Sequence, residues 1–272
     1  MIGLALEGGA ARGAYHVGVV KALLEAGYKF DGYVGTSIGA INAAAFAQGD
    51  IAEAEEMWRH LSTEALFDTD VSKLLMIGKS KWDMQYFTDV TSGLRKIAGQ
   101  HGIDTSRIKD LIYRFIDEGK VRASGCDYGL VTVSVNEIKP YELFLEDIPQ
   151  NQLLPYIEAS SCVPGFIPVV IGDNTYIDGA LYNNCPVNML VKKGYTEIIA
   201  VRTKAPGVYR RVRPRKGVTI RTISPRHNMG NSLIFDPEKI SENIDTGYRD
   251  GLAAAEAFRA LPASGDRTDL PA

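Results

Sequence analysis

The first fifty residues alternate short apolar runs with helical segments, and this alternation limits the folds open to the chain. Residues 2–6 form an apolar run that ends at Gly8-Gly9, as expected for a buried strand followed by a tight turn. Residues 11–26 have helical spacing, Tyr33-Val34 predicts a second strand, and the Ala-rich residues 38–48 predict a second helix. Strand, helix, strand and helix in this order indicate a parallel sheet with right-handed crossovers.

The rest of the chain continues this mixed pattern. Further strands are expected at 128–135, 141–145, 175–177 and 197–202, and further helices at 51–61, 105–118, 153–161 and 237–261. The punctuated segment 62–104 suits either a cover over a site or ordinary inserted helices. Because no repeat, low-complexity block or linker interrupts the chain, we expect one domain over 1–262, with 51–120 as a helical insertion or cover and 263–272 as a loose tail.

Composition narrows the class of protein. The chain has 272 residues with a net charge of -3, which gives no reason to expect a nucleic acid as partner. Cys126, Cys162 and Cys185 are odd in number and far apart, which predicts reduced thiols rather than disulfides or a zinc site. The N-terminus lacks signal-peptide features, and no run approaches the ~20 apolar residues of a spanning helix. We therefore expect a cytoplasmic location, with any membrane contact peripheral.

The pentapeptide Gly35-Thr36-Ser37-Ile38-Gly39 lies between the second predicted strand and the second predicted helix. Small residues at such a place allow a sharp turn that presents a serine hydroxyl to a substrate. The helix that begins there also favours negative charge near Ser37. The same pattern suits a serine that caps a helix in a glycine-rich turn. Pattern and context alone therefore leave the nucleophile and the cap equally open.

A loop of small residues, Gly8-Gly9-Ala10-Ala11-Arg12-Gly13, follows the first predicted strand. Successive backbone N–H groups in such a loop can surround one anionic oxygen, and Arg12 adds positive charge beside them. The loop contains neither GxGxxG nor GxxxxGK[ST], which argues against a nucleotide phosphate site. A tight turn that simply needs small residues is the alternative.

Asp178-Gly179-Ala180 follows a short predicted strand. A carboxylate there can take the proton of a serine if it is oriented, partly desolvated and within hydrogen-bond reach. Asp-Gly is also a favoured turn dipeptide. The order Ser37, Asp178, His227 would suit an α/β-hydrolase triad, but in that fold the nucleophile follows more strands than the two that precede Ser37.

These motifs, taken in order, resemble the patatin-like phospholipase family over roughly residues 1–205. The resemblance is carried by residues 4–15 with Val17-Gly18-Val19, residues 34–42, Ala159-Ser160-Ser161 with Pro164, residues 176–180, and Asn184-Cys185-Pro186-Val187. The expected fold is accordingly a three-layer α/β/α architecture with a mainly parallel central sheet.

In that family the resemblance implies a Ser–Asp dyad that needs no histidine, no metal and no other cofactor. Ser37 would attack the ester carbonyl of a lipid, and Asp178 would take its proton and later activate water against the acyl-enzyme. The backbone of Gly8-Gly9-Ala10, with Arg12, would stabilise the oxyanion. The turns would be supported by Gly35, Gly39 and Gly179. The expected function is a lipid acyl hydrolase of the phospholipase A or esterase type.

Two positions depart from the family pattern. Ala10 stands where a third glycine is usual, and alanine tolerates positive φ poorly, although its N–H stays available. Ala180 replaces another frequent glycine, while Asp178 and Gly179 are kept.

A basic stretch follows the last predicted parallel strand, at Arg210, Arg211, Arg213, Arg215 and Lys216. It suits either anionic lipid headgroups or a solvated loop. Two rival functions also remain open. One is a Ser-His-Asp hydrolase that uses His227, and the other is a lipid-binding regulator that keeps the fold without catalysis.

Overall fold

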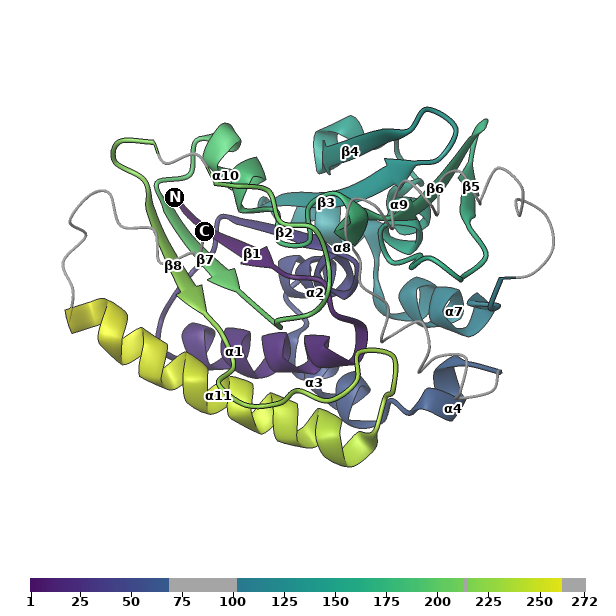
Figure 1. Cartoon of the computed structure of the whole chain (residues 1–272). Coiled ribbons are helices and arrows are strands. Elements are labelled where there is room, and N and C mark those ends of the chain that lie inside the picture. The colour runs from purple at the N-terminus through teal and green to yellow at the C-terminus, as the bar shows by residue number, and fades with distance from the viewer. Residues whose placement is uncertain (69–101, 213–214, 261–272) are drawn as a thin grey trace.

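A computed structural model describes residues 1–68, 102–212 and 215–260. Within these ranges a sheet runs through the middle of the molecule and helices cover both of its faces (Figure 1). The strands are β1 (Ile2–Leu6), β2 (Gly32–Thr36), β3 (Asp127–Ser134), β4 (Lys139–Phe144), β5 (Val169–Ile171), β6 (Asn174–Asp178), β7 (Glu197–Val201) and β8 (Thr219–Ile223). The α-helices are α1 (Ala14–Glu25), α2 (Ile38–Ala47), α3 (Ile51–Arg59), α4 (Thr63–Leu66), α7 (Ser106–Phe115), α8 (Glu118–Ala123), α9 (Leu153–Ser160), α10 (Val187–Lys193) and α11 (Pro237–Ala260).

The strand order is β5-β6-β3-β2-β1-β7-β8, and β4 pairs with β3 outside this path. Strands β3, β2, β1, β7 and β8 are parallel neighbours. Strands β4, β5 and β6 join the sheet in antiparallel pairs. The predicted mainly parallel sheet is confirmed.

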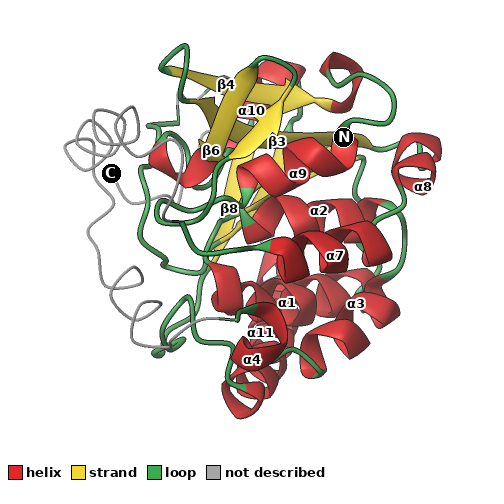
Figure 2. Cartoon of the chain, turned by 90° about the vertical axis from the view of Figure 1, so that its right-hand side faces the viewer, coloured by secondary structure: helices red, strands yellow, loops and turns green. Residues whose placement is uncertain are grey.

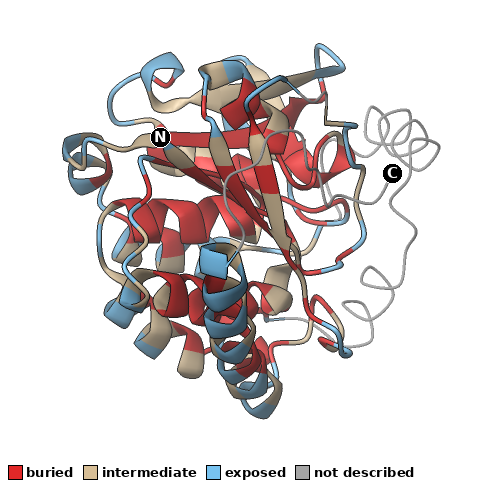
Figure 3. Cartoon of the chain, turned by 90° about the vertical axis from the view of Figure 1, so that its left-hand side faces the viewer, coloured by how far each residue is buried: buried red, intermediate tan, exposed pale blue. Residues whose placement is uncertain are grey.

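Each face of the sheet has its own hydrophobic core, because successive side chains of a strand point to opposite faces. Leu4 and Leu6 of β1 join the larger core, which includes residues of α1, α2, α9 and α11. Ala5, between them, joins a smaller core against α10. Figure 2 shows most of the helices on the side of the sheet that has the larger core. Figure 3 shows the buried strands between the two helical layers. The three-layer α/β/α prediction is therefore confirmed.

Most predicted elements are present, with shifted ends. The first predicted helix, 11–26, begins as a 3₁₀ turn at Ala10–Gly13 before α1 starts. Strands β5 and β8 and helix α10 were not predicted from the sequence. β5 has only three residues, and α10 has seven, so neither gives a long periodic signal.

Some sequence predictions fall outside the described residues. Most of the segment 62–104 and all of the tail 263–272 are among them, so their predicted roles stay predictions, as does the single domain over 1–262. The described parts of 51–120 are mainly helical, in α3, α4, α7 and α8. The three cysteines are unpaired, with Cys162 and Cys185 buried and Cys126 half-buried. Across the described ranges, no helix combines the length and the apolar character needed to cross a bilayer.

Candidate active site

The loops after β1 and β2 meet at one edge of the sheet, because these strands are parallel neighbours with Leu6 opposite Gly35. The Gly8-Gly9-Ala10 loop follows β1, and Ser37 follows β2. A Cβ atom built on Gly8 would lie 3.2 Å from Ser37 Cβ, so the two predicted motifs touch. Parallel pairing of the first two strands thus places the small-residue loop beside the predicted nucleophile.

Ser37 sits in a strained turn between β2 and α2. Its φ is 57° and its ψ is -130°, a conformation that non-glycine residues rarely adopt. Only glycine fits at Gly35 and Gly39: an added Cβ would lie 2.1 Å from Gly39 O in the first case and 2.3 Å from Leu6 O in the second. The Ser37 side chain is 5% exposed. The hydroxyl is therefore reached through a pocket rather than from an open surface.

Ser160 at the end of α9 braces this turn. Its hydroxyl accepts a hydrogen bond from the Ser37 N–H at 3.0 Å and donates one to Val131 O of β3 at 2.7 Å. Both partners are buried. A single side chain thus ties the strained turn to the neighbouring strand.

Asp178 ends β6, opposite Thr132 of β3. Its backbone N–H donates to Cys162 O at 2.8 Å, and its Oδ1 accepts from the Ala180 N–H at 2.7 Å. An added Cβ on Gly179 would lie 2.2 Å from Val131 O, so this Asp-Gly turn packs directly on β3. Asp178 is fully buried.

Burial raises the pKa of Asp178 to about 7, and the hydrogen bond from Ala180 and the nearby Ser37 hydroxyl oppose this rise. Asp178 Oδ2 has no hydrogen-bond partner among the described residues. The Ser37 hydroxyl is thus close enough to lower the pKa of the Asp178 carboxyl. Ser37 Oγ and Asp178 Oδ2 nevertheless do not meet the geometric criteria of a hydrogen bond. Such bonds often tighten only when a substrate binds.

In the loop after β1, some backbone N–H groups donate hydrogen bonds within the fold and others have no acceptor among the described residues. Gly8 N–H donates to Asn184 O at 2.9 Å, and Ala11 N–H donates to Ser232 O at 2.8 Å. Within the described ranges, the N–H groups of Gly9 and Ala10 have no acceptor. Ala10 has a φ of 46°, so the alanine does adopt the positive φ that the family's usual glycine would tolerate better.

The Arg12 side chain stabilises this loop through hydrogen bonds to two backbone carbonyl groups. Its Nε donates to Gly230 O at 3.0 Å, and one terminal nitrogen donates to Lys204 O at 2.6 Å. Partial burial lowers the pKa of its guanidinium group. These two bonds join the loop after β1 to the segments that follow β7 and β8.

Glu7, which directly precedes the same loop, is held by an ion pair and several hydrogen bonds. It is fully buried and pairs with Arg202. It also accepts hydrogen bonds from the N–H groups of Thr203 and Ala205 and from the Tyr209 hydroxyl, at 3.2, 3.1 and 2.6 Å. Burial raises the pKa of the Glu7 carboxyl, and the Arg202 charge opposes the rise. A buried charge with this many partners fixes the segment after β7 against the end of β1.

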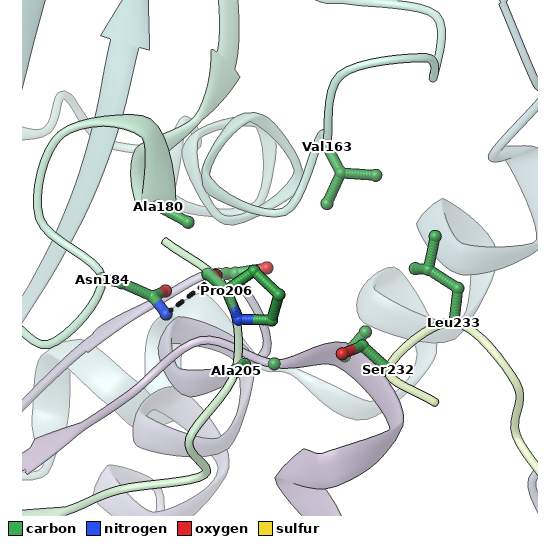
Figure 4. A pocket seen from close by; sticks show the side chains of 10 residues that line it. Val163, Ala180, Asn184, Ala205, Pro206, Ser232 and Leu233 are labelled. Carbon is green, nitrogen blue, oxygen red and sulfur yellow. Dashed lines mark hydrogen bonds between the residues drawn. The ribbon is translucent and has the colours of Figure 1, made fainter. Parts of the chain in front are cut away.

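Two pockets meet at Ser37. The first encloses about 360 Å³, part of it open to solvent, and is lined by Gly9, Ala10, Ser37, Val163, Ala180, Asn184, Ala205, Pro206, Ser232 and Leu233. Figure 4 shows the side chains of the residues that line it, seven of them labelled. The second encloses about 570 Å³ and is lined mainly by apolar side chains of α2, α3, α4, α7 and the segments 161–166 and 233–235. Ala10, Ser37, Val163 and Leu233 line both pockets.

The histidines lie elsewhere. His227 is exposed. His16 is fully buried beside Asn42, and burial lowers its pKa to about 3. His60 bonds to Glu56 O in an exposed position, and His101 lies outside the described residues. His227 lines neither of the two pockets at Ser37, and the triad that would use it stays a rival prediction. Residues 1–68, 102–212 and 215–260 also contain no cluster of three side chains suited to a metal ion.

Part of the basic stretch lines a surface groove beside α10. The groove includes Arg210, Arg211 and Arg215, and the Arg210 guanidinium lies 4.6 Å from the centre of the Tyr182 ring. Arg213 falls outside the described residues. Contact between this stretch and anionic lipid headgroups stays a prediction.

Sequence reasoning gave no role to three residues that shape the site. Ser160 and Asn184 were singled out only as parts of the family resemblance, whereas nothing in the local pattern around Ser232 marks it. Their partners lie far away in the chain, as with the bond between Ala11 and Ser232. Only the folded chain brings them together.

Comparison with known proteins shows which family the sequence is similar to. The sequence profile of the patatin-like phospholipase family matches residues 4–191. An NTE family protein of Mycobacterium tuberculosis is 30% identical over 74% of this chain, which corresponds to 30% of that protein. The lysophospholipase NTE1 of Mycosarcoma maydis is 28% identical over 74% of this chain, or 9% of that protein. The chain thus spans about a third or less of these relatives.

The fold has a counterpart among solved structures. VipD from Legionella pneumophila superimposes with a TM-score of 0.55 and 14% sequence identity, over 94% of this chain and 67% of that chain. At this identity the likeness concerns the fold alone. The family profile covers well over half of the chain, from β1 through the loop after β2 and Asp178 to α10. The chain belongs to the patatin-like phospholipase family.

Proposed function

We propose that this chain is a lipid acyl hydrolase in which Ser37 is the nucleophile and Asp178 the general base. The observation that carries the proposal is the strained turn at Ser37, which opens into a pocket shared with Gly9, Ala10 and Ala180. Backbone strain of this kind persists only where the surrounding structure enforces it, and it concentrates at functional sites.

The proposed reaction has two halves. Asp178 takes the hydroxyl proton of Ser37 as the oxygen attacks the ester carbonyl, and the alcohol leaves with a proton returned by Asp178. Asp178 then takes a proton from water, which attacks the acyl-enzyme, and the fatty acid leaves as Ser37 recovers its proton. A pKa near 7 leaves a usable fraction of Asp178 ionised at neutral pH and still makes it a competent base.

The developing oxyanion requires donors that are not already used. Because the N–H groups of Gly9 and Ala10 lack acceptors within the described ranges, we assign them to the oxyanion. Gly8 and Arg12, which are bonded to Asn184, Gly230 and Lys204, then hold the loop in place. The pocket beside Ser37 suits a fatty acyl chain, since its lining is mainly apolar, as in ligand sites for apolar groups.

The test is hydrolysis of p-nitrophenyl acyl esters of increasing chain length by the purified chain and its Ser37→Ala variant. We expect the variant to lose at least about 10³-fold in kcat. A fluorophosphonate probe should label the wild-type chain at Ser37 only. Ser106→Ala, which removes an exposed serine hydroxyl at the start of α7, is the matched control and should keep both activity and labelling. Equal rates for the wild type and Ser37→Ala would remove Ser37 as the nucleophile, and an unlabelled Ser37 would favour a binding protein.

A further inference from the structure

Two residues that line the Ser37 pocket each have a buried polar atom without a partner in the described part of the chain. Asn184 Oδ1 and Ser232 Oγ have no hydrogen-bond partner among the described residues. Both residues line the first pocket and neither lines the apolar one. Figure 4 shows the Asn184 amide and the Ser232 hydroxyl on opposite sides of the pocket, each with its oxygen turned toward the middle. Buried polar atoms are nearly always paired, so two unpaired ones in one pocket require an explanation.

The orientation of the Asn184 amide is fixed by its neighbours. Its Nδ2 donates to Pro206 O and to the Tyr209 hydroxyl, both at 3.3 Å. Tyr209 uses its single proton toward Glu7 or Ala205 O, so it can only accept from Asn184. A reversed amide would set two oxygens against each other at Pro206. The backbone of Asn184 is held as well, with its N–H on Val208 O and its carbonyl on Gly8 N–H.

The unpaired oxygen of Asn184 lies close to the reacting serine. Asn184 Oδ1 and Ser37 Cβ are 2.2 and 3.2 Å from the same point, the position of a Cβ atom built on Gly8. A group bound to Asn184 Oδ1 therefore lies next to the ester that Ser37 would attack. Because the apolar pocket, which also reaches Ser37, suits the acyl chain, the first pocket receives the alcohol part of the substrate.

The chemistry of the two atoms selects the group that they bind. An amide oxygen only accepts hydrogen bonds, so its partner must bring a proton. A phosphate oxygen or a second ester carbonyl brings none and would leave the acceptor unpaired. A hydroxyl group can donate to Asn184 Oδ1 and also exchange a hydrogen bond with Ser232 Oγ.

We propose that Asn184 and Ser232 form a hydroxyl subsite that binds a free hydroxyl group of the substrate beside the scissile ester. The substrates it selects are acyl esters of polyols, such as glycerol, that keep at least one free hydroxyl next to the acylated one. This inference rests on the proposed function, since it assigns the alcohol side of the same pocket.

The test compares two esters that differ only in the donor. 1-Decanoylglycerol keeps its free hydroxyls, and 1-decanoyl-2,3-di-O-methylglycerol has none. We expect kcat/KM to favour the first by about tenfold in the wild-type chain, the usual order for one hydrogen bond to a buried acceptor. Asn184→Ala should bring the ratio close to one, and Ser232→Ala should lower it part of the way. The matched control is Thr222→Val, which also removes a buried unpartnered hydroxyl but lies on β8 and lines neither pocket, and it should keep the wild-type ratio.

A ratio near one in the wild type overturns the subsite. An undiminished ratio in Asn184→Ala does the same, because general damage to the loop lowers both rates alike and leaves their ratio intact. The non-hydrolysable ethers 1-O-decylglycerol and its dimethyl counterpart separate the subsite from the proposed chemistry. Their Kd ratio in the Ser37→Ala variant should also be about tenfold, and it requires no turnover. Undiminished hydrolysis by the Ser37→Ala variant, with this Kd ratio preserved, would refute the proposed reaction alone, and equal Kd values would refute the subsite.

Discussion

At the scale of single residues, the site concentrates conformations that cost free energy. Five non-glycine residues in the described ranges have positive φ, and Ala10 and Ser37, which face the same pocket, are two of them. Asp178 adds a different cost, because a fully buried carboxylate lacks the hydration that stabilises its charge. Each of these costs works against folding, so each should appear as a trade between stability and activity.

Asp178 makes this trade measurable through pH. Its pKa in the folded chain is about 7, above the ordinary value of 3.8, so between these pH values the folded chain holds a proton that the unfolded chain has lost. Stability therefore falls as pH rises through this window. Asp178→Asn cannot ionise, and its free energy of unfolding should improve relative to the wild type by about 3 kcal/mol between pH 4.5 and 7.5. Urea unfolding of both chains at the two pH values measures the difference.

Activity should have the opposite dependence on the same group. If Asp178 acts as the base, kcat/KM of the wild type should fall about tenfold for each pH unit below about 7. Asp178→Asn should be nearly as inactive as Ser37→Ala, since members of a dyad act as a unit. A rate that does not change between pH 5 and 8, or an active Asp178→Asn variant, would contradict this role.

At the scale of elements, the most extensive contact among the described helices joins α1 to α11. Figure 1 shows the two helices side by side under the sheet. Gly18 of α1 meets Ile244 O, and Gly247 of α11 meets Tyr15 O, so the two backbones approach through glycines. Val17-Gly18-Val19 was part of the family resemblance, but its partner α11 lies beyond the matched residues 4–191. The sequence therefore marked Gly18 without its reason.

Gly18→Ala should separate these helices. The added Cβ would lie 1.9 Å from Ile244 O, a backbone atom that cannot turn away. Alanine normally stabilises a helix relative to glycine by about 1 kcal/mol, so a net loss would have to come from the helix contact. We expect a loss of about 1–3 kcal/mol in the free energy of unfolding, measured by urea or thermal unfolding. Leu252→Ala, at an exposed position of α11, is the control and should change stability little. An unchanged or more stable Gly18→Ala variant would show that the two helices adjust freely.

How far the sequence reaches depends on the distance between partners in the chain. Ser37 and the loop after β1 could be found because each is a short pattern at the end of a strand, and parallel pairing then joins them. Asp178 could be found only with the family order, since Asp-Gly alone suits any turn. Strand β8 and the packing of Ser232 against Ala11 depend on contacts across the fold, which no local pattern encodes.

At the scale of the whole molecule, many helices and loops together line the apolar pocket. Its wall combines α2, α3, α4 and α7 with the segments 161–166 and 233–235, so no one element determines its depth. It reaches Ser37, where it meets the first pocket, whose mainly apolar lining includes Asn184 and Ser232. The proposed reaction thus divides the site at the strained serine, with the acyl chain in the apolar pocket and the alcohol beside Asn184 and Ser232.

This division predicts that acyl-chain length can be changed without touching the chemistry. Met57 of α3 is half-buried and lines the apolar pocket. Met57→Trp should fill part of it, so kcat/KM for long-chain p-nitrophenyl esters should fall about tenfold while the short acetyl and butyryl esters change less than about threefold. The exposed neighbour Glu56 provides the control: Glu56→Trp adds the same ring outside the pocket and should leave the chain-length profile unchanged. An equal fall for short and long esters would mean that α3 affects the dyad itself, and no change for either would place the acyl chain elsewhere.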